Sequence, residues 1–322
     1  MIKIALIGVG RWGSNILRTL EGMRGIKVLV YNANATPPSP SPHPVKLRHG
    51  AGLRGGERLS SSSEGEVEGV DGVIIATPGS THAEIALPYV SAGVPTFIEK
   101  PMATSLKDAE RLARAARQSG ALVQVGHIHL YNPAYRKLKA QVERIGTVRL
   151  LQFEGMNNGP VRDDMSVLWD WGPHAVSLAL DLLGQMPQLV QAYGQYVLKP
   201  RGYRHDALQL RLLFNAGIET TGLLNWIAPS KRVQLTVTGT AGWLVFDDTA
   251  PAGKKVVLHR GGRVTYPRYS TEPPLKAELG AFIMAIKTGR QVLADARHGL
   301  NVVRVLAAAE RSAALDGRRV AL

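Results

Sequence analysis

With 322 residues, of which 45% are hydrophobic, the chain has the length for two domains and the composition of a soluble globular protein. It contains no cysteine, which excludes disulfides, a thiolate nucleophile and cysteine-ligated zinc or iron–sulfur sites, and no other metal site is predicted. The net charge of +14 would suit nucleic acid, but the basic residues are spread over the whole length and only 6% of residues are aromatic. We therefore expect no nucleic-acid partner, and a positive field that steers an anionic substrate or cofactor.

No apolar run reaches the length of a membrane span, so no membrane partner is expected. The N-terminal residues Met1–Leu6 form a short strand-like run that leads directly into glycines, without the cleavage site of a signal peptide. A cytoplasmic location follows as an expectation.

The first predicted strand, Ile2–Ile7, ends in Gly8-Val9-Gly10-Arg11-Trp12-Gly13, and a helix is predicted over Ser14–Met23. A G-x-G-x-x-G motif between a strand and a helix is typical of a dinucleotide-binding turn. Its glycines give a tight turn, close approach of the backbone to a pyrophosphate, and close packing of helix on strand. We expect this turn to bind NAD or NADP.

The second predicted strand, Ile26–Tyr31, lacks the acidic residue that normally binds the cofactor ribose about twenty residues after the glycines. Asn32 or Asn34 could hydrogen-bond a ribose hydroxyl, but neither would repel a 2′-phosphate. The choice between NAD and NADP stays open.

The next segment, Ala33–Glu64, holds five Pro, six Ser and four Gly, with no Ile, Met or aromatic residue. A doubly wound fold needs a helix and a strand here, whereas this composition predicts an irregular loop and impaired cofactor affinity. Because regular periodicity stops abruptly at Tyr31 and resumes at Val70, one hypothesis is that the segment is translated out of register. The alternative is a genuine divergent loop.

Strands and helices then alternate, which predicts a parallel sheet with helices on both faces. The expected elements are the strands Val70–Pro78, Val94–Ile98 and Leu122–Val125 and the helices Ser80–Ala92 and Ser105–Ser119.

The strand Val94–Ile98 ends in Glu99-Lys100-Pro101, where a charged pair stands at the carboxyl end of a buried strand. In an open α/β sheet that end is where ligands bind, and burial of such charges is costly unless they are paired. Taken alone, the stretch favours a surface ion pair that closes a strand, and the neighbouring motifs reverse that preference.

From about Gly146 the pattern changes to successive strands, as in Ala207–Phe214, where Leu208, Leu210 and Leu212 face the side opposite to Gln209. This predicts a mostly antiparallel sheet that is covered on one side, with its bare face available for a subunit contact. The other expected strands are Val148–Phe153, Leu189–Val197, Glu219–Trp226, Val233–Gly239 and Trp243–Asp247, and two helices are expected near Leu275–Lys287 and Arg297–Leu315.

The fold class expected is therefore α/β: a Rossmann dinucleotide-binding domain over residues 1–126, and a second, α+β domain over residues 127–322 with a large, open and mostly antiparallel sheet. The second domain is expected to bind the substrate and to make a homo-oligomer through its sheet.

Four features together resemble the Gfo/Idh/MocA family of NAD(P)-dependent oxidoreductases, which includes inositol and sugar-nucleotide dehydrogenases. They are the glycine-rich turn, Ala76-Thr77-Pro78 with His82, Glu99-Lys100-Pro101, and Asp170-Trp171-Gly172-Pro173-His174. The resemblance covers nearly the whole chain except Ala33–Glu64, and Ser177 stands where the family often has a further Asp. It implies hydride transfer between the cofactor and a secondary hydroxyl of a sugar, cyclitol or sugar nucleotide.

The resemblance assigns catalysis to Lys100, Asp170 and His174. Removal of a hydride and a proton from an alcohol needs a neutral base, for which His is the usual choice. Asp170 is expected to cap a helix that runs to Leu183, with Pro173 and His174 in its first turn. Lys100 would stabilise the charge that develops on the hydroxyl oxygen.

The remaining candidates follow from their neighbourhood or from the resemblance. Those for the cofactor are Gly8, Gly10, Arg11, Trp12, Gly13, Asn32, Thr77, Pro78, His82, Glu99 and Lys100, and those for the substrate are Tyr131, Asn157 and Arg162, with His129, Asn132 and Asp163 behind them. The alternative function is a non-catalytic protein of the same fold that binds a cofactor or metabolite, because function lies in sites and not in the fold.

Overall fold

The computed structural model describes residues 1–31, 69–162, 164–198 and 205–322. Contacts divide the chain into two compact units: Met1–Gly126 with Leu275–Leu300, and His127–Pro274 with Asn301–Leu322. The division after Gly126 coincides with the expected domain boundary, whereas Leu275–Leu300 belongs to the first unit and not, as expected, to the second. Asn32, Asp163 and Ala33–Glu64, with the out-of-register hypothesis, lie outside the described residues.

The first unit contains a parallel sheet in the order β2-β1-β3-β4-β5. The order places the second strand at one edge and brings β1 next to β3, as in doubly wound sheets. This confirms the predicted parallel α/β domain. The strands are β1 Ile2–Ile7, β2 Ile26–Tyr31, β3 Gly72–Ile75, β4 Thr96–Glu99 and β5 Val123–Gly126.

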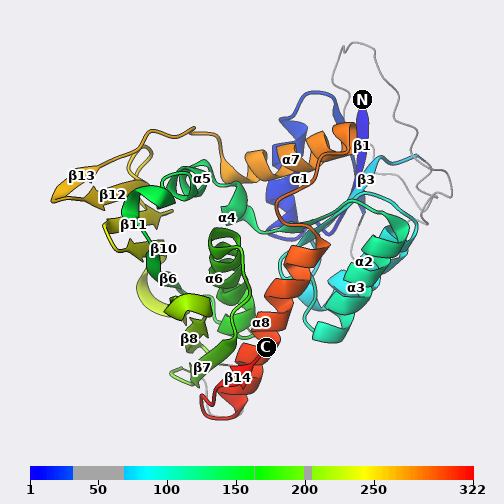
Figure 1. Ribbon diagram of the computed structural model, residues 1–322. Coiled ribbons are helices and arrows are strands. Elements are labelled where there is room, and N and C mark those ends of the chain that lie inside the picture. The colour runs from blue at the N-terminus through cyan, green and yellow to red at the C-terminus, as the bar shows by residue number, and fades with distance from the viewer. Residues whose placement is uncertain (32–68, 163, 199–204) are drawn as a thin grey trace. The chain divides into compact units, whose positions relative to one another are not determined.

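Three helices connect these strands: α1 Gly13–Glu21, α2 His82–Ser91, preceded by the short helix η1 Gly79–Thr81, and α3 Leu106–Ser119. Helix α3 is capped at both ends. The Ser105 hydroxyl accepts the Asp108 N–H at 3.1 Å, and Gly120 ends the helix in the left-handed conformation. Helices α2 and α3 pack side by side (Figure 1).

Helix α7, Pro274–Thr288, completes the first unit. Its apolar residues Leu279, Phe282 and Ile283 join the core formed by β1 and α1. Phe282 meets Phe97 of β4 edge to face, with ring centroids 5.8 Å apart. This packing of residues far apart in sequence explains why α7 belongs with the parallel sheet.

The second unit is built on a sheet in the order β13-β12-β11-β10-β6-β9-β8-β7-β14. Its neighbouring strands pair antiparallel except β6 and β9, which run parallel. The mostly antiparallel sheet was therefore predicted correctly. The strands are β6 Val148–Asn158, β7 Leu189–Gln195, β8 Ala207–Leu213, β9 Glu219–Asn225, β10 Ile227–Gly239, β11 Gly242–Asp247, β12 Val256–Arg260, β13 Arg263–Thr265 and β14 Val320–Ala321.

One face of this sheet is covered by α6, Val167–Leu183, which contacts β6, β8 and β9. In β8, Leu208, Leu210 and Leu212 are buried and Gln209 is exposed, as the alternation predicted. The other helices of the unit are α4 Ile128–Tyr131, α5 Pro133–Lys139, the short helices η2 Val142–Ile145 and η3 Asn215–Gly217, and the later part of α8, Ala296–Ala314.

Several elements of the second unit differ from expectation. Strand β10 starts at Ile227, so it continues through Pro229, whereas the sequence indicated a start at Val233. Strands β12, β13 and β14 were not predicted. β13 and β14 are very short, and β14 forms only by pairing with the distant strand β7. No helix in the described part of the chain is both long and apolar enough to cross a membrane.

Candidate active site

The glycine-rich turn between β1 and α1 is shaped by close backbone contacts. Gly8 has a φ of +92°, and a Cβ there would lie 2.9 Å from the carbonyl carbon of Ala76. A Cβ on Gly13 would collide with the Gly8 carbonyl oxygen. Only glycine therefore fits at either end of the turn, which brings the start of α1 against the end of β1.

Gly10 is different, because a Cβ built on it would have no described atom within 4 Å. The described structure therefore does not require glycine here for packing. Glycine is required only if a ligand approaches the backbone at this position. No side chain caps the first turn of α1, whose N–H groups and partial positive charge suit a phosphate. The turn fits the pyrophosphate of a dinucleotide.

Trp12 joins this turn to the Glu-Lys-Pro strand end. Its indole N–H donates to Oε1 of Glu99 at 2.6 Å, while the Lys100 N–H donates to Oε2 of Glu99 at 3.2 Å. Glu99 is buried, with 7% of its surface exposed, and a Cβ on Gly126 of the next strand would meet its carboxyl group. Glu99 therefore holds the turn and the backbone before Lys100 together.

Glu99 also has a buried acidic neighbour, Glu278 of α7. Burial raises the pKa of Glu99, against the lowering effects of the Trp12 hydrogen bond and the Lys100 charge. Burial and the charge of Glu99 raise the pKa of Glu278 well above its ordinary value. Glu278 is fully buried, and neither of its carboxyl oxygens has a hydrogen-bond partner among the described residues, so burial favours its neutral form.

His82, expected among the cofactor contacts, is 1% exposed. Its Nδ1 lies 2.8 Å from the Pro101 carbonyl oxygen and its Nε2 2.9 Å from that of Thr77. Burial lowers the pKa of His82, and the Lys100 charge acts in the same direction against the hydrogen bonds to the two carbonyls. The ring thus ties the end of β3 to the end of β4 instead of presenting a binding surface.

The surface near His82 is formed by Thr77, which is half-buried, and by Pro78, which is exposed. The Thr81 hydroxyl donates to the Thr77 hydroxyl at 2.8 Å. Arg11 and Trp12 are exposed on the glycine-rich turn, and Lys100 is half-buried. The expected cofactor residues in the described part of the first unit therefore come from the carboxyl ends of β1, β3 and β4, apart from the buried His82.

Asp170 does not cap its helix, which corrects the sequence-based expectation. Helix α6 begins at Val167 after Ser166, so Asp170 lies at the end of the first turn and Pro173 lies inside the helix. The Asp170 carboxylate instead accepts the indole N–H of Trp226 at 3.0 Å. A buried tryptophan from the end of β9 therefore orients this carboxylate.

His174 follows Asp170 by one helical turn, so both side chains lie on one face of α6. Its ring is 8% exposed and lies between aromatic neighbours. The centroid of Trp171 is 5.7 Å away and that of His129 on α4 is 4.7 Å away. His174 was expected in the first turn of this helix, but because α6 begins at Val167 it lies in the second turn. The aromatic rings around His174 were not predicted.

The three expected substrate residues, Asn157, Arg162 and Tyr131, have different surroundings. Asn157 on β6 accepts the Trp171 indole N–H at 2.8 Å and donates to the Gly159 carbonyl, so both ends of its amide are engaged. Arg162 makes two hydrogen bonds to Asp164, at 2.9 and 2.8 Å. Tyr131 is 7% exposed, on the short helix α4. These contacts make Asn157 a support for Trp171 in the described structure.

Trp226, which orients the Asp170 carboxylate, was not among the residues expected at the site. Trp226 lies 56 positions from Asp170, and no spacing rule connects them. Among the described residues, no cluster of three or more His, Cys, Asp or Glu side chains could hold a metal ion.

Comparison with known proteins places both halves of the chain in one family. Residues 2–127 match the family described as "Oxidoreductase family, NAD-binding Rossmann fold", and residues 111–245 match the "GFO/IDH/MocA C-terminal domain". Inositol 2-dehydrogenase 2 of Saccharopolyspora erythraea is 31% identical over 192 residues, which are 57% of this chain and 54% of that protein. Inositol 2-dehydrogenase of Acidiphilium cryptum is 34% identical over 44% of this chain and 41% of that protein. The matches thus span about half the length of these relatives.

Solved structures match over nearly the full length. A Magnetospirillum magnetotacticum MS-1 protein, designated an oxidoreductase, has a TM-score of 0.80 and 32% identity over 95% of this chain and 98% of that chain. UDP-N-acetylglucosamine 3-dehydrogenase GnnA of Acidithiobacillus ferrooxidans has a TM-score of 0.80 at 22% identity, over 98% of both chains. At that identity the second likeness concerns the fold alone.

Proposed function

Because this chain belongs to the Gfo/Idh/MocA oxidoreductase family, we propose that it transfers a hydride between NAD or NADP and a secondary hydroxyl of a sugar, cyclitol or sugar nucleotide. The observation that carries the proposal is the hydrogen bond between Trp12 and Glu99 at 2.6 Å. It joins a turn that fits a pyrophosphate to the strand end that carries Lys100. A dehydrogenase needs these two elements side by side.

The cofactor site is assigned to the first unit. The backbone of Gly8-Val9-Gly10 and the start of α1 hold the pyrophosphate, and Thr77 and Pro78 form part of the surface at the end of β3. When bound, the nicotinamide supplies the hydride acceptor. Buried His82 keeps the ends of β3 and β4 at a fixed spacing, so the protein spends little conformational freedom when the cofactor binds.

The proton is assigned to His174, whose neutral imidazole accepts it from the substrate hydroxyl. Asp170, oriented by Trp226, keeps a negative charge one helical turn from His174 and favours its protonated form. Lys100 is assigned to stabilise the negative charge that develops on the oxygen of the reacting hydroxyl. Tyr131 and Arg162 are assigned to the substrate, and Asn157 is assigned to support Trp171.

Two observations bear on the substrate. The relatives from S. erythraea and A. cryptum are named inositol 2-dehydrogenases, which favours a cyclitol. The net charge of +14 and the exposed Arg162 favour an anionic substrate such as a sugar nucleotide. The proposal therefore covers polyhydroxylated rings with or without an attached phosphate.

Exposed apolar side chains on the sheet of the second unit support self-association. Tyr193 of β7, Leu223 of β9 and Trp243 of β11 are 51%, 45% and 47% exposed. Large apolar side chains on one sheet suit an isologous contact between copies of the chain. A homo-oligomer in the cytoplasm is part of the proposal, and light scattering at several protein concentrations measures the oligomeric state.

The test of the proposal begins with calorimetric titration of the purified protein with NADH and with NADPH. Reduction of the preferred oxidised cofactor is then followed by absorbance with inositols, aldoses and nucleotide-linked sugars. The matched control is Gly10→Val, which leaves the protein contacts intact but fills the phosphate site. Cofactor binding without turnover of any hydroxyl substrate would favour a binding protein of the same fold.

A further inference from the structure

A second histidine, His129 of α4, lies against His174. Their ring centroids are 4.7 Å apart and the ring planes are inclined by 68°, so the contact is edge to face. His129 also meets Phe246 of β11 edge to face, with centroids 6.1 Å apart, and is only 7% exposed. The ring of His129 is therefore fixed by packing against both neighbours.

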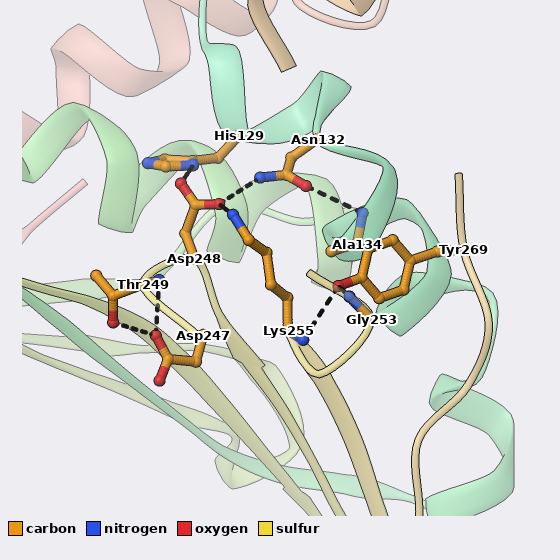
Figure 2. A network of polar contacts seen from close by, with 9 residues as sticks. All are labelled: His129, Asn132, Ala134, Asp247, Asp248, Thr249, Gly253, Lys255 and Tyr269. Carbon is orange, nitrogen blue, oxygen red and sulfur yellow. Dashed lines mark hydrogen bonds and ion pairs between the residues drawn. The ribbon is translucent and has the colours of Figure 1, made fainter. Parts of the chain in front are cut away.

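Asp248, at the end of β11, faces the ring of His129 (Figure 2). Its Oδ2 is 3.9 Å from Nδ1 of His129. Its Oδ1 accepts a hydrogen bond from Nδ2 of Asn132 at 2.9 Å and one from Nζ of Lys255 at 2.8 Å. One carboxylate oxygen is thus committed to the two donors, and the other is directed to the imidazole.

The turn that carries Asp248 is itself held at both ends (Figure 2). Oδ1 of Asp247 accepts the backbone N–H of Thr249 at 2.8 Å and its hydroxyl at 2.6 Å. The hydroxyl oxygen of Tyr269 accepts the N–H groups of Gly253 at 2.9 Å and Lys255 at 3.1 Å. Supports of this kind hold a charged side chain in one position.

The carboxylate is anionic at neutral pH. Burial acts to raise the pKa of Asp248, but the neighbouring His129, the contact with Lys255 and the hydrogen bond from Asn132 together lower it. On α6, Asp170 lies one turn before His174, and the charge of Asp170 also acts on Arg162. Each imidazole therefore has one carboxylate near it: Asp248 faces His129, and Asp170 lies one helical turn from His174.

We propose that Asp248 and His129 act together as positioning residues for His174: Asp248 selects the His129 tautomer with the proton on Nδ1, and the fixed His129 ring holds the plane of the His174 imidazole. The proposal rests on the proposed function, in which His174 accepts the proton of the substrate. The negative charge of Asp248 also favours the positive charge that His174 then acquires. A carboxylate that orients an imidazole is a recurrent way to set its tautomer.

Two variants distinguish this role from simple packing. Asp248→Asn keeps the shape of the side chain and its acceptor for Asn132 and Lys255, but removes the charge and directs an amide to His129. His129→Phe keeps the edge-to-face contacts but removes both ring nitrogens. Glu272→Gln, at an exposed position, is the control for the loss of one carboxylate. Thermal melting of each variant reports whether it folds.

Activity is the first readout. We expect Asp248→Asn and His129→Phe each to lower kcat by about 10²-fold, because misplacement of a base by a small distance costs that much. The Kd for the cofactor should not change, and the acidic limb of the pH profile of kcat/KM should move to lower pH in Asp248→Asn. If both variants fold and retain the wild-type kcat and pH profile, the positioning role is overturned.

Nuclear magnetic resonance of ¹⁵N-histidine-labelled protein is the second readout, and it needs no substrate. We expect Asp248→Asn to change the tautomer of His129 and to shift the pKa of His174 downward, with His129→Phe and His174→Gln used to assign the signals. Suppose that Asp248→Asn shows these changes but the wild-type protein turns over no hydroxyl substrate. That result would support the positioning pair and contradict the proposed function. Unchanged histidine signals in folded Asp248→Asn would overturn the pair, whatever the activity.

Discussion

The indole N–H of Trp12 donates a hydrogen bond to Oε1 of Glu99 at 2.6 Å. The two residues are 87 positions apart, yet this contact joins the glycine-rich turn to the end of β4. The bond is charge-assisted whenever Glu99 is ionised, and such bonds are about twice as strong as neutral ones. The position of the backbone before Lys100 thus depends on a residue of the phosphate-binding turn.

The first prediction concerns this bond. Trp12→Phe keeps an aromatic ring but removes the donor, so we expect cofactor affinity to fall by about tenfold, from the typical free energy of a hydrogen bond to a charged group. Calorimetry measures the affinity without depending on tryptophan fluorescence. Trp243→Phe, on the exposed sheet face of the second unit, is the control. Equal affinity in the two variants would show that the bond does not support the site.

The second prediction contrasts two glycines of the same turn. Gly10→Val should leave the melting temperature near that of the wild type, because no described atom lies within 4 Å of the added Cβ, but it should abolish cofactor binding. Gly13→Ala should lower the melting temperature, because its Cβ collides with the Gly8 carbonyl. Circular dichroism and calorimetry measure the two properties. Normal cofactor affinity in Gly10→Val would mean that the turn binds no pyrophosphate.

The third prediction concerns the chemical step. Lys100→Ala and His174→Ala should each lower kcat by about 10²–10⁴-fold, the usual contribution of a proton-transfer or charge-stabilising group. Cofactor affinity should change much less than kcat. Steady-state kinetics with the best substrate of the screen provides the measurement, and a variant with near-wild-type kcat would remove that residue from the proposed mechanism.

The fourth prediction concerns pH-dependent stability and Glu278. The pKa of its carboxyl group is raised in the folded protein, chiefly by burial and then by the charge of Glu99. Below the ordinary pKa of a glutamate, both the folded and unfolded forms are protonated and the stability is fully present. As the pH rises above that value, the unfolded chain releases its proton first, so stability falls by up to about 1.4 kcal/mol per pH unit until the folded pKa is reached.

Glu278→Gln removes this dependence. We expect it to melt close to the wild type at about pH 5 and above the wild type at about pH 9. Glu272→Gln, at an exposed position on the same approach to α7, should follow the wild type at both pH values. If the stability of the wild type falls no more than that of Glu278→Gln as the pH rises, Glu278 is not held neutral.

Much of the local structure in both units was readable from the sequence, because short-range residue patterns determine it. The G-x-G-x-x-G motif between Ile2–Ile7 and a helix, and the capping of α3 by Ser105 and Gly120, follow from backbone conformations that only certain residues adopt. The alternation in β8 follows from the period of a strand. Lys100, Asp170 and His174 were named from the family resemblance, and their catalytic roles stay predictions.

What the tertiary structure decided is the set of partners for those residues. Asp170 was expected to cap a helix, but α6 begins at Val167, three residues before it. The Asp170 carboxylate is held by Trp226 instead. Asp248 reaches His129 only because β11 and α4 converge in the second unit. Such contacts join positions that no periodicity relates. Burial, which sets the pKa of Glu278 and the role of His82, is a property of the assembled core and not of any one segment.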